Sequence, residues 1–188
     1  MVYRWLFPLL WLVFIAVWIA MARGGKAVAE RESVYSRLSH YLPLGIAICL
    51  IAAPQVPIPP LDGRFVALSL WPVQAGLGLV VAGLAFAIWA RALLGGNWSS
   101  DVTLKREHEL ILEGPYRWVR HPIYTGILLA LAGSALALGE WRGVLAVAFA
   151  GAAYWRKLRI EEAVMRRQFG EAYAEYAKRV PALIPFML

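Results

Sequence analysis

The sequence predicts an all-α protein: an integral membrane bundle of five transmembrane helices with a cytoplasmic helical segment at its C-terminal end. Of the 188 residues, 61% are hydrophobic and only 16% are charged. A soluble domain carries about half apolar and about a quarter charged residues. The apolar residues form long uncharged blocks, and tryptophans cluster near the block ends, as they do at membrane–water interfaces. These observations favour a membrane protein over a soluble domain.

Five apolar blocks are candidate spans, and the first three reach or nearly reach the roughly 20 residues that a helix needs to cross the hydrocarbon core. The first block has no charge and no small-residue cleavage site, so we expect a retained helix and not a signal peptide. The last two blocks are shorter and predict a helical hairpin over residues 122–155, whose second helix can run on into the charged segment behind it. The five blocks are residues 5–22, 38–57, 72–94, 122–138 and 143–155.

Prolines, glycines and other small residues mark the expected helix ends and contacts. Pro72 and Pro122 suit the first turn of a helix, where a missing N–H costs nothing, and Gly139 suits a helix end. Small residues at helical spacing either let helices approach closely in lipid or reflect only the abundance of Ala and Gly in such helices. These small residues form the pairs Gly78/Ala82, Ala130/Ser134 and Ala146/Ala150.

The basic residues predict the orientation of the bundle and limit its partners. All but three of the 19 Lys and Arg residues fall on one side if the N-terminus faces out; the exceptions are Arg4, Arg64 and Arg142. Because cytoplasmic loops carry the excess of positive charge, we expect the C-terminus in the cytoplasm. The charges flank the spans and form no single stripe, which argues against a nucleic-acid partner. Three histidines and one cysteine show no metal-ligand spacing, so we expect no metal site.

Two polar segments, residues 95–121 and 156–180, lie on the predicted cytoplasmic side. Burying polar side chains at the ends of membrane spans costs free energy, and proteins keep such residues mainly where they have a function. We therefore expect these two segments to form a joint site. The pair His121-Pro122 begins the fourth predicted helix. The positive end of that helix then faces the cytoplasmic boundary and suits an anionic group.

The fifth predicted helix carries two adjacent carboxylates into this region. Glu162 shares a face with apolar residues at helical spacing. A carboxylate in such a stripe needs a cationic partner or a ligand. Glu161 lies four residues after Lys157, so an ordinary surface ion pair is its plainest interpretation. We expect Gly170 to end the helix and residues 171–180 to form a short amphipathic continuation.

The motifs of the two polar segments resemble a known family. Residues 114–126 read Gly-Pro-Tyr-x3-Arg-His-Pro-x-Tyr-x-Gly, and Glu161-Glu162 follows. Residues 169–176 read Phe-Gly-Glu-x-Tyr-x2-Tyr, and residues 179–181 read Arg-Val-Pro. In this order and spacing they resemble the isoprenylcysteine carboxyl methyltransferase family, which is related to phospholipid N-methyltransferases. The resemblance covers roughly residues 85 to 185, and the first two predicted spans carry no signature of it.

The resemblance implies a membrane-embedded methyltransferase that uses S-adenosylmethionine and O-methylates the carboxylate of a lipophilic, isoprenylcysteine-like or lipidated acceptor. With the orientation that the basic residues predict, we expect the site on the cytoplasmic side of a prokaryotic cytoplasmic membrane. We interpret the chain as a single membrane domain (1–188) with an N-terminal two-helix segment (1–60) and a catalytic core (72–185). The partners would be the acceptor and the lipid bilayer.

The resemblance also assigns residues to roles. The acceptor-orienting cation falls at Lys157 or, one position earlier, at Arg156, and Glu162 is the third catalytic candidate. The implied cofactor-binding residues are His108, Glu109, Leu110, Ile111, Tyr116, His121, Pro122, Ile123, Tyr124 and Glu161.

Three alternative functions remain at this point. An amine acceptor, as in phospholipid N-methyltransferases, must lose a proton first, and Glu162 would then serve as general base. A sterol-reductase-like oxidoreductase would carry an Asn and an Asp where this chain has Ile123 and Ile127, which argues against a nicotinamide site. The third alternative is a non-catalytic membrane adaptor, against which the intact motif set argues.

Overall fold

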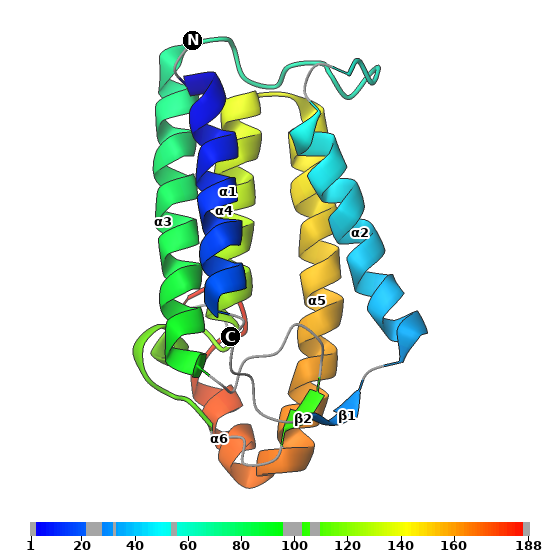
Figure 1. Ribbon diagram of the computed structural model, residues 1–188, viewed down its shortest axis with the longest axis vertical. Coiled ribbons are helices and arrows are strands. Elements are labelled where there is room, and N and C mark those ends of the chain that lie inside the picture. The colour runs from blue at the N-terminus through cyan, green and yellow to red at the C-terminus, as the bar shows by residue number, and fades with distance from the viewer. Residues whose placement is uncertain are drawn as a thin grey trace.

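The computed structural model describes residues 3–21, 28–31, 33–53, 56–95, 103–105 and 110–185. Figure 1 shows a bundle of long helices with the two short strands and the last helix gathered at one end. The elements in chain order are α1 (Tyr3–Met21), β1 (Val28–Arg31), α2 (Val34–Ala52), α3 (Leu70–Leu94), β2 (Thr103–Lys105), the 3-10 turn η2 (Gly114–Arg117), α4 (Pro122–Leu138), α5 (Trp141–Phe169) and α6 (Glu171–Arg179).

The helices form two groups that meet where α4 packs against α5. In Figure 1, α1, α3 and α4 lie together, and α2 lies beside α5. α4 joins the groups, because Leu131 packs with Ala146 and Ala150 of α5 and with Ala47 of α2. The predicted hairpin of α4 and α5 is therefore present, and it is the framework on which the other helices pack.

Glycines allow α3 and α4 to pack with their backbones in contact. A Cβ on Gly83 would lie 2.4 Å from the carbonyl oxygen of Gly126, and a Cβ on Gly76 would lie 2.4 Å from that of Gly133. Real side chains do not approach so closely, so only glycine fits at these positions. We call these four residues the glycine seam. From the first pair to the second, the residue number falls on α3 while it rises on α4. The two helices are therefore antiparallel.

The seam corrects one of the predicted helix contacts. The pair Gly78/Ala82 faces away from the other helices: both residues are exposed, and a Cβ on Gly78 would meet nothing within 4 Å. The other predicted small residues are buried at helix contacts, namely Ala130, Ser134, Ala146 and Ala150. α3 is apolar on all sides, so its sequence gives no polar face from which to infer the packed one.

The helix boundaries around the polar segments follow the local signals in the sequence. α4 begins at Pro122 and ends before Gly139, whose φ of 68° is in the left-handed region that glycine tolerates. α5 continues without a break through the second polar segment to Phe169. Gly170 ends it, with φ of 53°. The amphipathic continuation is α6, whose Tyr173 and Tyr176 are buried. These predictions are confirmed.

The described chain is helical, as predicted, apart from one short ribbon that the sequence did not predict. β1 and β2 pair as an antiparallel ribbon, which joins the α1–α2 and α3–α4 connections at the α6 end of the bundle. Strands of three and four residues are too short to show an alternating pattern, and their pairing partner is distant in sequence.

Two helices of the described chain, α2 and α3, are long and apolar enough to cross a membrane by length and composition. α1 and α4 are apolar over shorter stretches, Trp5–Met21 and Pro122–Leu138. The five-span topology therefore stays a prediction.

Three basic residues are predicted on the non-cytoplasmic side, and two of them lie at the end of the bundle opposite α6. Arg142 is 2% exposed; it pairs with Glu140 at 2.6 Å and donates to the carbonyl oxygens of Ala53 at 3.1 Å and Val56 at 2.8 Å. Arg64 also approaches Glu140, at 3.8 Å. This arrangement ties the α2–α3 connection to the α4–α5 turn and leaves the polar site at the other end.

Candidate active site

The connection that leads into α4 is held in place by two tyrosines. Gly114 has φ of 55° and begins the 3-10 turn. Tyr116 is buried after it and donates its hydroxyl hydrogen to the carbonyl oxygen of Ala90 in α3 at 3.3 Å. Tyr176 of α6 in turn donates to the carbonyl oxygen of Tyr116 at 2.7 Å. Burial raises the pKa of both phenols, so they remain protonated donors at physiological pH.

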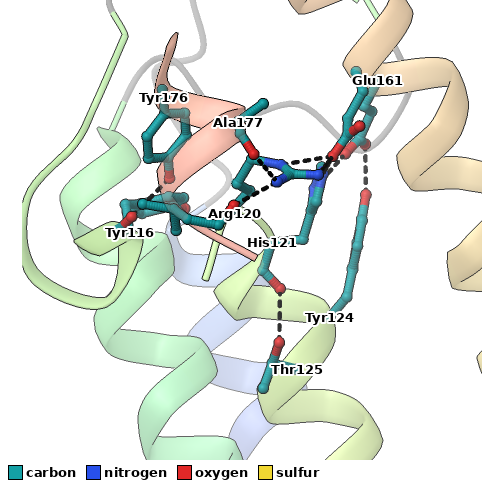
Figure 2. Close-up of polar contacts among 10 residues, drawn as sticks. Tyr116, Arg120, His121, Tyr124, Thr125, Glu161, Tyr176 and Ala177 are labelled. Carbon is teal, nitrogen blue, oxygen red and sulfur yellow. Dashed lines mark hydrogen bonds and ion pairs between the residues drawn. The ribbon is translucent and has the colours of Figure 1, made fainter. Parts of the chain in front are cut away.

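The start of α4 meets the C-terminal half of α5 in a cluster of polar side chains, of which Arg120, His121, Tyr124 and Glu161 are labelled in Figure 2. Tyr124 donates its hydroxyl hydrogen to Glu161 at 2.5 Å. His121 lies between the two carboxylates, with Nδ1 3.5 Å from Glu161 and Nε2 3.3 Å from Glu162. Arg120 approaches Glu162 at 2.6 Å through Nη2 and at 2.8 Å through Nε. We call these five residues the carboxylate cluster.

The two carboxylates of the carboxylate cluster differ in their surroundings. The Glu162 side chain is 11% exposed and faces Arg120, whereas the Glu161 side chain is 25% exposed. The predicted cationic partner of Glu162 is therefore Arg120. Of the two carboxylates, Glu161 keeps the larger surface for a ligand.

The end of α6 and the chain after it support the carboxylate cluster through their main-chain carbonyl groups. Arg120 donates from its guanidinium to the carbonyl oxygens of Ala177, at 3.0 Å, and Val180. The backbone N–H of Arg120 donates to Pro181 at 2.8 Å, and that of His121 donates to Ala182 at 3.0 Å. The sequence predicted no role for these carbonyl groups, because any residue can supply a main-chain acceptor. Only the Arg-Val-Pro motif at 179–181 marked this part of the chain as belonging to the family pattern.

Electrostatics keep both carboxylates ionised. Burial opposes ionisation of Glu162, but hydrogen bonds from His121 and Arg120 outweigh it and lower its pKa to about 2. Burial likewise opposes ionisation of Glu161, and the His121 hydrogen bond, the Lys157 charge and Tyr124 lower its pKa. Burial lowers the pKa of His121, but hydrogen bonds to both carboxylates reverse this and raise it.

These shifts predict how stability depends on pH. The lowered carboxylate pKa values stabilise the fold above about pH 4.5, the ordinary value, and this contribution is lost as the pH falls toward about 2. The raised pKa of His121 stabilises the fold below about pH 6.5, its ordinary value, and this contribution is lost as the pH rises through the raised value. We expect the thermal unfolding temperature in detergent to be highest between these limits. His121→Gln should remove the alkaline decline; a decline that persists in this variant would contradict the assignment.

Aromatic rings extend the site from the carboxylate cluster into the bundle. The ring of His121 stacks on Tyr124 with centroids 5.6 Å apart, and Tyr124 stacks on Tyr154 of α5 at 4.6 Å. The buried residues Ile123 and Leu158 pack with Tyr124 and Tyr154, and Ile111 packs against this apolar group. The sequence analysis missed Tyr154, which has no motif and which only the packing of α4 on α5 identifies.

The two candidate acceptor-orienting cations point in different directions. Lys157 is half-buried, with its Nζ 5.7 Å from the ring centroid of Tyr124. Arg156 is exposed and donates to the hydroxyl of Ser39 in α2. Lys157 is therefore the candidate that faces the carboxylate cluster.

The remaining predicted site residues are distributed around this centre. Pro122 is buried at the first position of α4, and Leu110 is half-buried at the start of the connection. His108 and Glu109 lie outside the described residues. Among the residues that the structure describes, no group of three or more His, Cys, Asp or Glu side chains has the arrangement of a metal site.

Comparisons with known proteins agree with this geometry. Residues 71–172 match the family described as phospholipid methyltransferase. The protein-S-isoprenylcysteine O-methyltransferase B of Arabidopsis thaliana is 32% identical over 123 residues, which are 62% of this chain and 61% of the relative. The protein-S-isoprenylcysteine O-methyltransferase of Homo sapiens is 33% identical over 123 residues, which are 62% of this chain and 42% of the relative. The chain thus spans less than two thirds of each relative's length.

A solved structure shares the fold. It is that of a eukaryotic intramembrane Ras methyltransferase, isoprenylcysteine carboxyl methyltransferase, with a TM-score of 0.53 and 24% sequence identity, and the match covers 81% of this chain and 52% of that chain. The segment of the family match includes all of α4 and α5 and every residue of the carboxylate cluster. The resemblance inferred from the motifs is confirmed, and the chain belongs to the phospholipid methyltransferase family.

Proposed function

We propose that this chain is a membrane-embedded, S-adenosylmethionine-dependent methyltransferase that O-methylates the carboxylate of a lipophilic, isoprenylcysteine-like acceptor. The observation that carries the proposal is the Glu161 carboxylate. It is ionised, partly exposed and held in one orientation by Tyr124 and His121, inside the segment that matches the family. The relatives named as isoprenylcysteine O-methyltransferases supply the acceptor class.

The residues around Glu161 fit the proposed cofactor. S-adenosylmethionine carries a sulfonium and an amino group, both of which are positive, and an ionised carboxylate in a partly dehydrated site attracts such groups strongly. His121 and Tyr124 would hold the carboxylate in place. Apolar residues at the start of α4 and on the connection before it would line the adenosyl part of the cofactor: Leu110, Ile111, Tyr116, Pro122 and Ile123. The resemblance assigns His108 and Glu109 to the same cofactor site.

The proposed chemistry needs orientation more than proton transfer. The bound cofactor supplies an electrophilic methyl group. A carboxylate acceptor is already ionised at neutral pH, so the chain must hold it in line, orient it with a cation and exclude water. Lys157 is the proposed cation, since it lies beside Tyr124. Arg156 is the less favoured candidate, because its guanidinium donates to Ser39.

Phospholipid N-methylation is the second candidate function, and the description of the matched family favours it. That reaction requires a general base. Glu162 would have to supply it, but its pKa is lowered to about 2 and its carboxylate is engaged by Arg120. A carboxylate with so low a pKa is a poor base near neutral pH. This electrostatic arrangement supports the carboxylate acceptor over the amine.

The proposed setting is a membrane in which the polar end of the bundle, with the carboxylate cluster and α6, faces the cytoplasm. The distribution of basic residues supports this orientation. The acceptor would enter sideways from the lipid and the cofactor from the cytoplasm. Residues 72–185 would form the catalytic core, and the segment 1–60 would complete the bundle.

Titration with S-adenosylhomocysteine in detergent tests the proposed function. We expect saturable binding to the purified protein. Glu161→Gln should weaken it roughly 10- to 100-fold, since a hydrogen bond to a charged group contributes about 1.5–3 kcal/mol. Glu171→Gln is the matched control, because that side chain is 80% exposed on α6, and it should leave the affinity unchanged. Absence of saturable binding to the wild-type protein would reject the proposal.

A second measurement separates the two acceptor classes. Membranes that contain the protein are supplied with labelled methyl donor and with either N-acetyl-S-farnesylcysteine or phosphatidylethanolamine. We expect label in the farnesylcysteine ester, which base hydrolysis releases as methanol. Base-stable label in the phospholipid would instead establish N-methylation.

A further inference from the structure

α2 reaches the proposed acceptor side of the site, although its sequence has no motif of the family. It lies beside α5 (Figure 1), and its N-terminal turns meet the two basic residues there. Ser39 accepts a hydrogen bond from Arg156. The ring centroid of Tyr41 lies 5.9 Å from Nζ of Lys157. The N-terminal segment therefore contacts both candidate acceptor-orienting cations.

Lys157 lies between two tyrosine rings from different helices. Its Nζ is 5.9 Å from the ring of Tyr41 in α2 and 5.7 Å from that of Tyr124 in α4. Both distances are within the roughly 6 Å over which a cation is attracted to an aromatic face. The rings hold the ammonium without neutralising its charge, and that charge also acts on Glu161, whose pKa it lowers.

We propose that Tyr41 and Tyr124 form an aromatic cradle for the ammonium of Lys157, and that Tyr41 is the positioning residue through which α2 fixes where an acceptor carboxylate binds. The inference rests on the proposed function, in which Lys157 orients the acceptor. Lysine offers a point charge on a flexible stem. A second aromatic wall restricts that stem, and the cation is then already in place before the acceptor arrives.

The exposure of neighbouring residues separates this role from ordinary packing. His40 is 3% exposed, whereas Tyr41 is 40% exposed. The helix therefore buries position 40 and leaves position 41 partly exposed, with the Tyr41 ring 4.7 Å from that of His40 on one side and 5.9 Å from Nζ of Lys157. Tyr35, on the same helix, is 83% exposed and serves as a matched control for the loss of a tyrosine from α2.

Steady-state kinetics with N-acetyl-S-farnesylcysteine test the cradle. Tyr41→Leu should raise the KM for this acceptor about three- to tenfold, the effect of losing one cation–π contact, while kcat stays close to the wild-type value. Tyr41→Phe keeps the ring and should keep the wild-type KM. Tyr35→Leu should also keep it. A wild-type KM in Tyr41→Leu, or a KM in Tyr41→Phe as high as in Tyr41→Leu, would overturn the proposal.

A spectroscopic measurement tests the cradle without turnover. The chain has four lysines, which reductive methylation labels with carbon-13 methyl groups. The signal of Lys157, assigned with Lys157→Arg, should be displaced upfield by the two rings. Tyr41→Leu should reduce that displacement, and Tyr35→Leu should not. An undisplaced Lys157 signal in the wild-type protein would refute the cradle.

The two proposals fail in different measurements. If Tyr41→Leu keeps the wild-type KM for the acceptor and the wild-type protein binds S-adenosylhomocysteine, only the cradle is contradicted. Absence of S-adenosylhomocysteine binding in the wild-type protein would contradict the proposed function, and the methyl signals would still decide whether the two rings enclose Lys157.

Discussion

Replacing Arg120 with methionine should lower the free energy of unfolding by about 3 kcal/mol, because removal of one partner from a buried ion pair leaves the other charge without compensation. The side chains of Arg120 and Glu162 are each 11% exposed and approach to 2.6 Å. The guanidinium also donates to the carbonyl oxygens of Ala177 and Val180. His121 remains beside Glu162 at 3.3 Å, so we expect the lower end of the usual range of about 3–5 kcal/mol.

Chemical unfolding in detergent, followed by tryptophan fluorescence, measures this loss. Arg117→Met removes an exposed arginine from the same connection and should change stability by less than about 0.5 kcal/mol. The double variant Arg120→Met/Glu162→Met should be more stable than the sum of the single effects predicts, by at least about 1 kcal/mol, because the uncompensated charge is gone. Additive effects in the double-mutant cycle would show that the two residues do not act as a pair.

The sequence predicted the ends of the site helices well because their signals are local. Pro122 begins α4, and Gly170 ends α5 with a positive φ. Each residue acts on its own backbone, so its effect does not depend on which elements surround it. The apolar spacing on α5 also predicted that Glu162 is buried and needs a cationic partner or a ligand. The identity of that cation, Arg120, depends on how α4 packs against α5, and the sequence alone did not contain it.

Other contacts had no signal in the sequence. The carbonyl groups of Ala177 and Val180 act through the backbone, which is the same for every residue. Tyr41 belongs to a helix without any motif, and its role depends on the packing of α2 on α5. Of the two interpretations of the small residues, close packing does not hold for Gly78 and Ala82, because α3 packs through Gly76 and Gly83. That helix is apolar on every side, so helical spacing fits several faces equally well.

The glycine seam explains why the motif that leads into α4 ends in Gly126. A glycine at this position lets a ligand or a neighbouring element approach closely. The structure identifies the neighbour as α3, since a Cβ on Gly126 would lie 2.5 Å from the carbonyl oxygen of Gly83. Gly126 directly follows Thr125, whose backbone N–H donates to the carbonyl oxygen of His121. The close contact with α3 therefore also fixes the position of the carboxylate cluster relative to α3.

Gly83→Leu should lower the free energy of unfolding by more than about 3 kcal/mol, or prevent folding. Even a Cβ would lie 2.4 Å from the carbonyl oxygen of Gly126 and 2.7 Å from the backbone nitrogen of Ala130. These are backbone atoms, which cannot rotate away, so α3 and α4 must separate. Inserting atoms into a well-packed interior usually costs about 1–3 kcal/mol and more where the backbone must move.

The same substitution at Gly78, on the same helix, should have the opposite sign. A Cβ there would meet nothing within 4 Å, and leucine favours a helix over glycine by roughly 0.8 kcal/mol. Gly78→Leu should therefore unfold at or above the wild-type denaturant concentration, and Gly83→Ala should fall between the wild-type protein and Gly83→Leu. Equal stability of the two leucine variants would mean that α3 and α4 do not meet along these glycines. The carboxylate cluster at the start of α4 would then lack the support that α3 gives it.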